Sequence, residues 1–264
     1  MTTSTGLRRP TQARHETLMQ YVRGGVTRVE DLAAEMGVSE STVRRDLTYL
    51  SRAGQLTRTY GGATVDGAGV FHELVLAERM SLRSPAKAAI GRLAAGLVPD
   101  GGTIFLDAGS TTMQLAGQLN PEAKLTVVTR GLELALMLAG APHLEVVLLG
   151  GTVVANTHGV VGPLTDTGFD RFHFDVVFLG VDELDPVAGV GEATAAEART
   201  KELAAQRARR TVVLADATKL TSHTVPSWAP LPAGWILITD ETDNRVLDRY
   251  REAGVEVIVA EYAE

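Results

Sequence analysis

The sequence predicts an α/β protein, with an N-terminal winged helix-turn-helix followed by a larger, mostly parallel α/β domain. Residues 29–52 contain two short amphipathic helical patterns separated by Gly37, which is the arrangement of a helix-turn-helix. From residue 103 onward, Val, Ile and Leu runs alternate with helical patterns, as in parallel sheets covered on both faces. We expect a winged-helix domain at residues 1–62, a connector at residues 63–83 and an α/β domain at residues 84–264.

The second helical pattern has an apolar side and a polar side. Ser39 offers a side-chain oxygen that can accept a hydrogen bond from a free backbone N–H at the helix start. Val43, Leu47 and Leu50 recur at i, i+4 and i+7 and therefore face a core. Hydroxyl groups and arginines lie on the opposite side. Such a helix fits the major groove of DNA, where arginine bonds guanine and a hydroxyl bonds a base edge or a phosphate.

A wing follows this helix. Residues 55–60 alternate in character and lead into Gly61 and Gly62, which predicts two short strands beside the helix. The candidate DNA-binding residues of helix and wing are Ser39, Ser41, Thr42, Arg44, Arg45, Thr48, Arg52, Arg58 and Tyr60. On the pattern alone, an ordinary helical pair with solvated arginines remains the alternative.

The two parts of the chain differ in charge. The formal net charge is −7, but residues 1–65 hold 9 Lys and Arg against 6 Asp and Glu, a net charge of +3. The rest holds 16 against 26, a net charge of −10, so it would repel DNA and must have another task. The absence of cysteine excludes disulfides and suits a cytoplasmic protein. No apolar run reaches the roughly 18 residues of a membrane span.

The second domain repeats a unit of strand, polar turn and helix. We expect strands at residues 103–106, 125–128, 145–149, 176–179, 212–215, 235–239 and 255–259, and helices at residues 84–97, 132–139, 195–209 and 246–253. Ligands of open parallel sheets bind beyond the carboxyl ends of the strands. Because polar residues follow these strands, we expect the ligand site at that edge of the sheet.

The turn at residues 107–112 is the sharpest candidate for this site. Gly109 allows the backbone to approach a ligand closely. Ser110, Thr111 and Thr112 combine hydroxyls with the free amides of a helix amino terminus, which attract a phosphate. Asp107 suits a sugar hydroxyl. An ordinary capped turn between a strand and a helix is the alternative.

Three lysines are further candidates for binding an anion. Lys201 lies four residues after Glu197, so the two share a helix face. They form either a surface ion pair worth about 0.3–0.5 kcal/mol or a site in which Lys201 faces a phosphate. Lys87 and Lys219 are isolated cations, and solvation is the alternative for each. The six histidines are scattered, so we expect no metal site, and we expect no cofactor.

Residues 37–63, GVSESTVRRDLTYLSRAGQLTRTYGGA, closely resemble the winged helix-turn-helix of the DeoR family of bacterial transcriptional regulators. The second domain resembles that family's effector domain, notably at residues 104–112, 127–129, 149–151, 178–182 and 215–219. The resemblance covers the chain from about Arg14 to Val259. Three departures are visible. Arg28 stands where a Ser or Thr cap often precedes the first motif helix, Tyr60 replaces the usual His, and Arg130 replaces the usual Asn.

The resemblance implies an effector domain related to ribose-5-phosphate isomerase that binds a phosphorylated sugar. The effector-binding residues that we expect on these grounds are Asp107, Gly109, Ser110, Thr111, Thr112, Thr129, Arg130, Asp182, Lys201, Asp216 and Lys219. The expected partners are double-stranded operator DNA, the sugar phosphate and further copies of the chain in a dimer or tetramer. Arg130 either pairs with a second anionic group or blocks the usual ligand.

Two functions from different classes fit these observations. The favoured one is a DNA-binding transcriptional regulator, expected to repress sugar-metabolism genes, with no catalytic residues. The alternative is an enzyme resembling a sugar-phosphate isomerase that carries a DNA-binding domain. An isomerase needs a general base on the substrate carbon, and Asp107, Asp182 and Glu197 have suitable chemistry.

Overall fold

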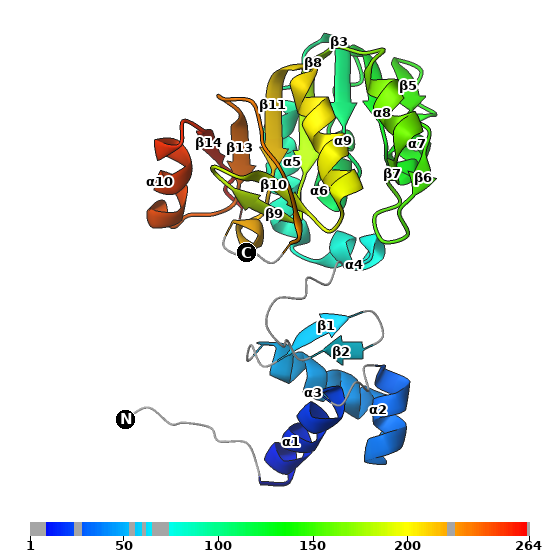
Figure 1. The fold of residues 1–264 in the computed structure, drawn as a ribbon, viewed down its shortest axis with the longest axis vertical. Helices are drawn as coiled ribbons and strands as arrows, with labels where there is room; N and C mark the ends of the chain where they lie inside the picture. The colour runs from blue at the N-terminus through cyan, green and yellow to red at the C-terminus, as the bar shows by residue number, and fades with distance from the viewer. Residues whose placement is uncertain are drawn as a thin grey trace. The chain divides into compact units, whose positions relative to one another are not determined.

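The computed structural model describes residues 9–23, 28–52, 56–59, 62–64, 74–220 and 225–262 (Figure 1). Contacts divide the chain into two compact units, residues 1–74 and residues 75–264. We call them the first unit and the second unit. In the described part of the chain, no helix is long and apolar enough to cross a membrane.

The first unit has three helices and a two-stranded sheet. Their order is α1 (Arg9–Arg23), α2 (Val29–Met36), α3 (Glu40–Arg52), β1 (Thr57–Thr59) and β2 (Gly62–Thr64). The strands are antiparallel, with Arg58 opposite Ala63. The predicted core residues Val43, Leu47 and Leu50 are buried with Leu18 and Leu32. The winged helix-turn-helix is therefore present as predicted.

The turn between α2 and α3 follows from two residues. Gly37 ends α2 in the left-handed region, with φ of 63°, which glycine adopts without steric cost. The Ser39 hydroxyl accepts a hydrogen bond from the Thr42 amide at 3.3 Å and thereby satisfies a free donor of the first turn of α3. This confirms the predicted role of Ser39 at the start of the helix.

A seven-stranded parallel sheet forms the centre of the second unit. Its order is β14-β13-β11-β8-β3-β4-β5, and every neighbouring pair is parallel. The strands are β3 (Gly101–Leu106), β4 (Lys124–Thr129), β5 (Leu144–Leu148), β8 (Phe174–Gly180), β11 (Ala208–Leu214), β13 (Ile236–Thr239) and β14 (Glu256–Val259).

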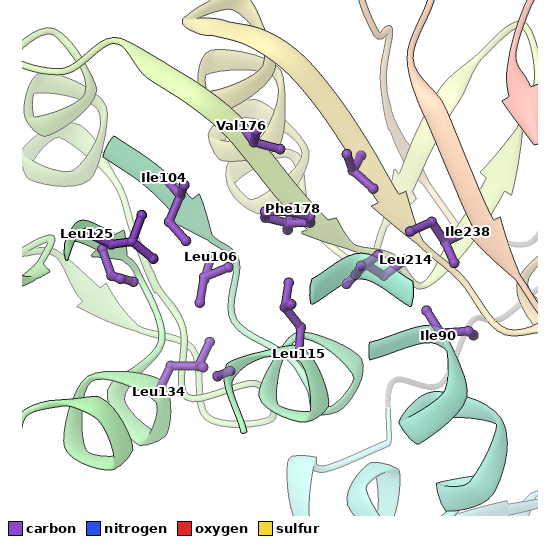
Figure 2. Close-up of a cluster of buried hydrophobic side chains, with 14 of the residues drawn as sticks. Ile90, Ile104, Leu106, Leu115, Leu125, Leu134, Val176, Phe178, Leu214 and Ile238 are labelled. Carbon is purple, nitrogen blue, oxygen red and sulfur yellow. The ribbon is translucent and has the colours of Figure 1, made fainter. Parts of the chain in front are cut away.

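Helices cover both faces of this sheet. The helices of the second unit are α4 (Leu76–Ser81), α5 (Ser84–Ala95), α6 (Ser110–Ala116), α7 (Leu132–Leu138), α8 (Pro163–Phe169), α9 (Ala195–Gln206) and α10 (Asn244–Glu252), with a 3-10 turn η1 (Ala217–Lys219); of these, α4 and η1 lie near the carboxyl ends of the strands. Ile104 and Leu106 pack against Ile90 of α5 and Leu115 of α6 (Figure 2). Phe105, between them in β3, packs on the other face in a cluster with Phe169 of α8. This alternation is why residues 104–106 of the strand are all apolar and buried.

Several short elements were not predicted. These are the hairpin of β6 (Thr152–Val153) and β7 (Val160–Val161), helix α8, and an antiparallel sheet of β9 (Glu183–Asp185), β10 (Gly189–Glu192) and β12 (Ser227–Ala229). The helix expected at residues 195–209 was too long, because α9 ends at Gln206. Ala208 already pairs with Phe174 of β8, so sheet pairing outweighs the helical pattern at residues 208–209.

Candidate nucleic-acid interface and ligand site

The polar side of α3 is accessible. Ser39, Ser41, Arg44, Arg45 and Thr48 are exposed, and Thr42 is half-buried. Arg44 is paired with Glu40 at 3.1 Å, and the Thr48 hydroxyl donates to the Arg44 carbonyl at 2.7 Å. Arg45 makes no hydrogen bond or ion pair within the described residues. Of the two neighbouring arginines, Arg45 is therefore the one whose guanidinium can bind DNA without first leaving a protein carboxylate.

Three predicted DNA-binding positions lie partly or wholly outside the described residues. The backbones of Arg52 and Arg58 are described but their side chains are not, and Tyr60 is not described. Their contacts with DNA stay predictions. The antiparallel pairing of β1 with β2 supports the expected wing.

A buried carboxylate fixes α3 to α1, which the sequence analysis missed. Asp46 accepts hydrogen bonds from Arg14 Nη2 at 2.9 Å and Nε at 2.5 Å, and its Oδ1 lies 3.1 Å from His15 Nε2. Burial raises the pKa of Asp46, but the bonds from Arg14 and His15 outweigh it and hold that pKa below its ordinary value. The helical spacing carried the signal, since Asp46 lies three residues after Val43 and four before Leu50.

In the second unit, buried charges gather at the carboxyl ends of the central strands. We call Asp107, Arg130, Asp182, Glu192, Glu197 and Lys201 the strand-end cluster; each is at most 4 % exposed. Asp107 directly follows β3 and lies at the centre of the strand-end cluster. Its Oδ1 accepts from Arg130 Nε at 2.6 Å, and its Oδ2 lies 3.1 Å from Lys201 Nζ. The sequence prediction that Asp107, Arg130 and Lys201 share one site is consistent with this geometry.

Lys201 holds two acidic residues together. It donates to the Gly180 carbonyl at 2.6 Å and to Glu192 Oε1 at 2.5 Å. Burial raises the pKa of Glu192 to about 8, although Lys201 acts in the opposite direction. For Asp107, burial is outweighed by Arg130 and Lys201, which hold its pKa below the ordinary value. The pKa values of the two carboxyl groups are therefore shifted in opposite directions.

Glu197 and Lys201 do not form the surface ion pair that was the alternative interpretation. Both side chains are buried. Glu197 instead accepts from the hydroxyls of Thr157 at 3.2 Å and Thr194 at 2.9 Å, and lies 3.9 Å from Arg130 Nη1. Arg130 thus does pair with a second anionic group, but that group belongs to the protein.

Three buried polar atoms of the cluster lack a hydrogen-bond partner among the described residues. They are Asp107 Oδ2, Arg130 Nη1 and Asp182 Oδ2. Asp107 Oδ2 has the nearby charge of Lys201, and Asp182 Oδ1 lies 3.1 Å from Arg79 Nη2 of α4. Because an unpartnered buried polar group is costly, these atoms are positions where a polar ligand would be stabilised.

Two lysines beside the cluster form no ion pair within the described residues. Lys87 is buried and donates to the Arg79 carbonyl, and burial lowers its pKa to about 8. Lys219 is half-buried, and burial together with the nearby charge of Arg79 lowers its pKa. Within the described residues, neither ammonium group lies within ion-pair distance of a carboxylate. The interpretation of Lys87 as a solvated surface residue is therefore wrong.

Some predicted residues are engaged in local structure. The Thr112 hydroxyl donates to the Gly109 carbonyl at 2.8 Å, and Thr129 Oγ1 accepts from the Gly131 amide at 3.0 Å. Asp216 accepts from Thr218 at the start of η1. Gly109 has φ of 152°, a backbone conformation that glycine adopts without steric cost. Ser110 and Thr111 are buried, with no side-chain hydrogen bond inside the described part of the chain.

The cluster also contains residues that the sequence analysis did not assign to it. Glu192 belongs to the unpredicted strand β10, and Arg79 lies in the segment expected to be a connector, residues 63–83. A separate hollow of about 750 Å³ lies at the other edge of the sheet, where the strands begin, among Thr103, Lys124 and Glu145. Its lining holds Glu122 and Glu145 against Lys124, a balance that disfavours an anionic ligand. No group of metal-ligating residues occurs in the described ranges.

Comparison with known proteins follows the same division of the chain. Residues 14–68 match a family model described as "DeoR-like helix-turn-helix domain". Residues 83–241 match a second model, "DeoR C terminal sensor domain". The chain belongs to the DeoR family. Its recognition from residues 37–63 and from the strand ends is confirmed.

Curated DeoR-type relatives match over most of their length. A putative aga operon transcriptional repressor of Escherichia coli O157:H7 is 30% identical over 94% of both chains. The HTH-type transcriptional regulator GlpR of Haloferax volcanii is 34% identical over 87% of this chain and 90% of that protein. Ribose 5-phosphate isomerase A of Methanocaldococcus jannaschii aligns over 50% of this chain and 52% of its own, with 20% identity and a TM-score of 0.38. The relation to that enzyme stays a prediction.

Proposed function

We propose that this DeoR-family protein is a sequence-specific repressor of sugar-metabolism genes, and that a phosphorylated sugar bound at the strand-end cluster relieves repression. Family membership supports the regulatory role, and names such as "Glycerol-3-phosphate regulon repressor", given to a 26% identical protein of Haemophilus influenzae, support the class of genes. The observation that carries the sensing role is the set of buried polar atoms without a hydrogen-bond partner among the described residues, beside two lysines that form no ion pair there.

The phosphate end of the ligand is expected at Lys87 and Lys219. A dianion between them would offset the repulsion with Arg79 that contributes to the lowered pKa of each. Ser110 and Thr111 add hydroxyls that are not otherwise engaged within the described residues. A phosphate without such cations would be strongly disfavoured in a buried site.

The sugar end is expected at Asp107, Arg130 and Asp182. Asp107 Oδ2 and Asp182 Oδ2 can accept from hydroxyls, while Arg130 Nη1 can donate to a hydroxyl oxygen. Sugar hydroxyls can do both, which is why a sugar suits this mixture better than a purely anionic ligand. Lys201, in contrast, is fully engaged with Asp107, Glu192 and Gly180, so we assign it a supporting role.

The DNA-binding role rests on α3. One such helix reads only a few base pairs, so useful affinity needs a second copy of the chain and a repeated or palindromic site. We therefore propose a homo-oligomer. Affinity for DNA should fall steeply with salt because the contacts displace counterions.

The isomerase alternative has less support. Asp182 is paired with Arg79 and Glu197 with two hydroxyls, and the lowered pKa of Asp107 makes it a weak base. A turnover assay with pentose and hexose phosphates tests this point, and measurable isomerisation would restore the enzyme hypothesis.

The function is tested with DNA that the full-length protein enriches from a random library. Ribose 5-phosphate, fructose 6-phosphate and glycerol 3-phosphate are first screened by thermal shift, then titrated into the protein–DNA complex. We expect one of them to bind and to weaken DNA binding by about 5- to 150-fold. Lys87→Ala and Lys219→Ala should lose the response, whereas Lys124→Ala, an exposed lysine, should keep it. A hit that binds tightly without changing DNA affinity would disprove relief of repression by a sugar phosphate.

A further inference from the structure

Helix α4 connects the two functions along the chain. It begins at Leu76, two residues after the end of the first unit at Leu74. Helix α4 belongs to the second unit, and its contacts are with that unit. The Leu76 amide donates to the Asn156 carbonyl at 2.7 Å, and Leu76 is buried. Helix α4 is therefore the first helix of the second unit along the chain, and it is fixed to that unit by its own contacts.

Helix α4 also carries an ion pair into the strand-end cluster. Arg79 Nη2 lies 3.1 Å from Asp182 Oδ1, and the two side chains are 14 % and 3 % exposed. The Arg79 carbonyl accepts from Lys87. Arg79 thus binds both Asp182, which is expected to contact the sugar, and Lys87, which is expected to contact the phosphate.

The space around α4 is too small for a ligand. Leu76 lines a narrow gap together with Ala108, Gly109, Gly131 and Thr157, and this gap leaves no room for even a water molecule. Sites for small molecules usually measure about 300–1,000 Å³. A sugar phosphate can enter here only if one wall moves. Ala108 and Gly109 belong to the turn after β3, whereas α4 is a separate helix of six residues.

Unpartnered polar atoms occur on both sides of this contact. Glu78 Oε2 of α4 is buried without a hydrogen-bond partner among the described residues, as is Asp182 Oδ2 opposite Arg79. The docked position of α4 is therefore only partly stabilised, and a ligand that satisfies Asp182 would compete with it.

We propose that α4 is a lid on the strand-end cluster, held shut by the Arg79–Asp182 pair and displaced by the ligand. Displacement of α4 lowers DNA affinity. The proposal rests on the sensing function proposed above and adds the element that transmits it. Arg79 is a positioning residue here, because it acts by holding α4 on Asp182.

Hydrogen exchange of the full-length protein measures docking of α4 directly. Arg79→Ala should accelerate exchange of the amides of residues 76–82 by about 10- to 100-fold, the factor for one charge-assisted hydrogen bond. Arg92→Ala, an exposed arginine of α5, is the matched control and should exchange like the wild type. If Arg79→Ala does not fold, Arg79→Gln removes the charge and keeps a donor. Wild-type exchange in the Arg79 variant that folds would overturn the lid.

DNA affinity tests transmission. On library-selected DNA without ligand, the Arg79 variant should bind at least about fivefold more weakly than wild type, and Arg92→Ala should bind normally. Asp182→Asn should weaken DNA binding to a similar extent. Combining it with the Arg79 substitution should weaken DNA binding little further, because the two residues act as one ion pair. Faster exchange of α4 with unchanged DNA affinity would refute transmission while leaving the regulator intact. Failure of the wild type to select any DNA would instead refute the proposed function.

Discussion

Arg130 allows a quantitative test of the buried charges. We consider Arg130→Met, which removes the charge and keeps a long side chain, so that little cavity forms. Arg130 is 1 % exposed and neutralises Asp107, with Glu197 3.9 Å away. Breaking a buried ion pair by removing one partner costs about 3–5 kcal/mol. We expect the lower end, about 3 kcal/mol, because Lys201 remains beside Asp107 and two hydroxyls remain on Glu197.

Tryptophan fluorescence during urea unfolding measures this cost. Both tryptophans of the chain, Trp228 and Trp235, belong to the second unit, so their emission reports the unit that contains Arg130. Arg92→Ala provides the control for loss of an exposed arginine. Replacing Asp107 by Asn in the Arg130→Met background should recover part of the stability, since it removes a buried charge that has lost its main partner.

The cost should also depend on pH. In the wild type, the folded pKa of Asp107 is below its unfolded value, so the stabilisation is present above the unfolded pKa and is lost as pH falls through the folded pKa. Without Arg130, burial raises the pKa of Asp107, which then protonates earlier as the pH falls. The difference between the two proteins should therefore shrink from about pH 7 towards pH 4. A cost below about 1 kcal/mol, the size of an exposed pair, would refute the reasoning.

Three further predictions concern the DNA surface and the lysines. Arg45→Ala should cost about 1–3 kcal/mol of DNA binding and relax base preference; if both it and Arg44→Ala bound selected DNA like the wild type in a mobility-shift titration, the assignment of the reader helix would be wrong. Asp46→Asn should lower the stability of the first unit by about 1–3 kcal/mol, measured by calorimetry, because Arg14 loses its buried partner; an unchanged transition would contradict this. The folded pKa of Lys87 is lowered to about 8, so the unfolded state binds more protons than the folded state between about pH 8 and about pH 10. Over this range, the free energy of unfolding of the wild type should rise relative to that of Lys87→Met. The affinity for the sugar phosphate should fall over the same range, because Lys87 loses its charge. If the free energy of unfolding changed with pH in the same way in both proteins, Lys87 would not be buried as a cation.

The sequence predicted those features that depend on local periodicity. The spacing of Val43, Leu47 and Leu50 determined the orientation of α3, and the apolar run at residues 104–106 identified a central strand. Asp107 could be placed because it follows that strand, and all carboxyl ends of a parallel sheet meet at one edge.

Pairing between distant residues could not be predicted in the same way. Nothing local indicates that Glu192 would meet Lys201 rather than solvent, since β10 is glycine-rich and short. Arg79 lies in a helix of six residues, too short for a periodic pattern to show which face is buried. The helix expected at residues 195–209 was too long because its last residues, Ala208 and Arg209, are polar or small and gain their strand conformation from β8.

The close approach of Arg130 to Gly159 has a consequence for the history of this sequence. A Cβ atom at residue 159 would lie 2.5 Å from Arg130 Nη1 and 3.0 Å from the Cβ of Ala108. Selection at position 159 is therefore conditional on the residue at position 130. In relatives with the shorter Asn at the place of Arg130, we expect side chains at the place of Gly159 to be tolerated more often. In an alignment of DeoR-type sequences, the residue at position 159 should therefore covary with the residue at position 130.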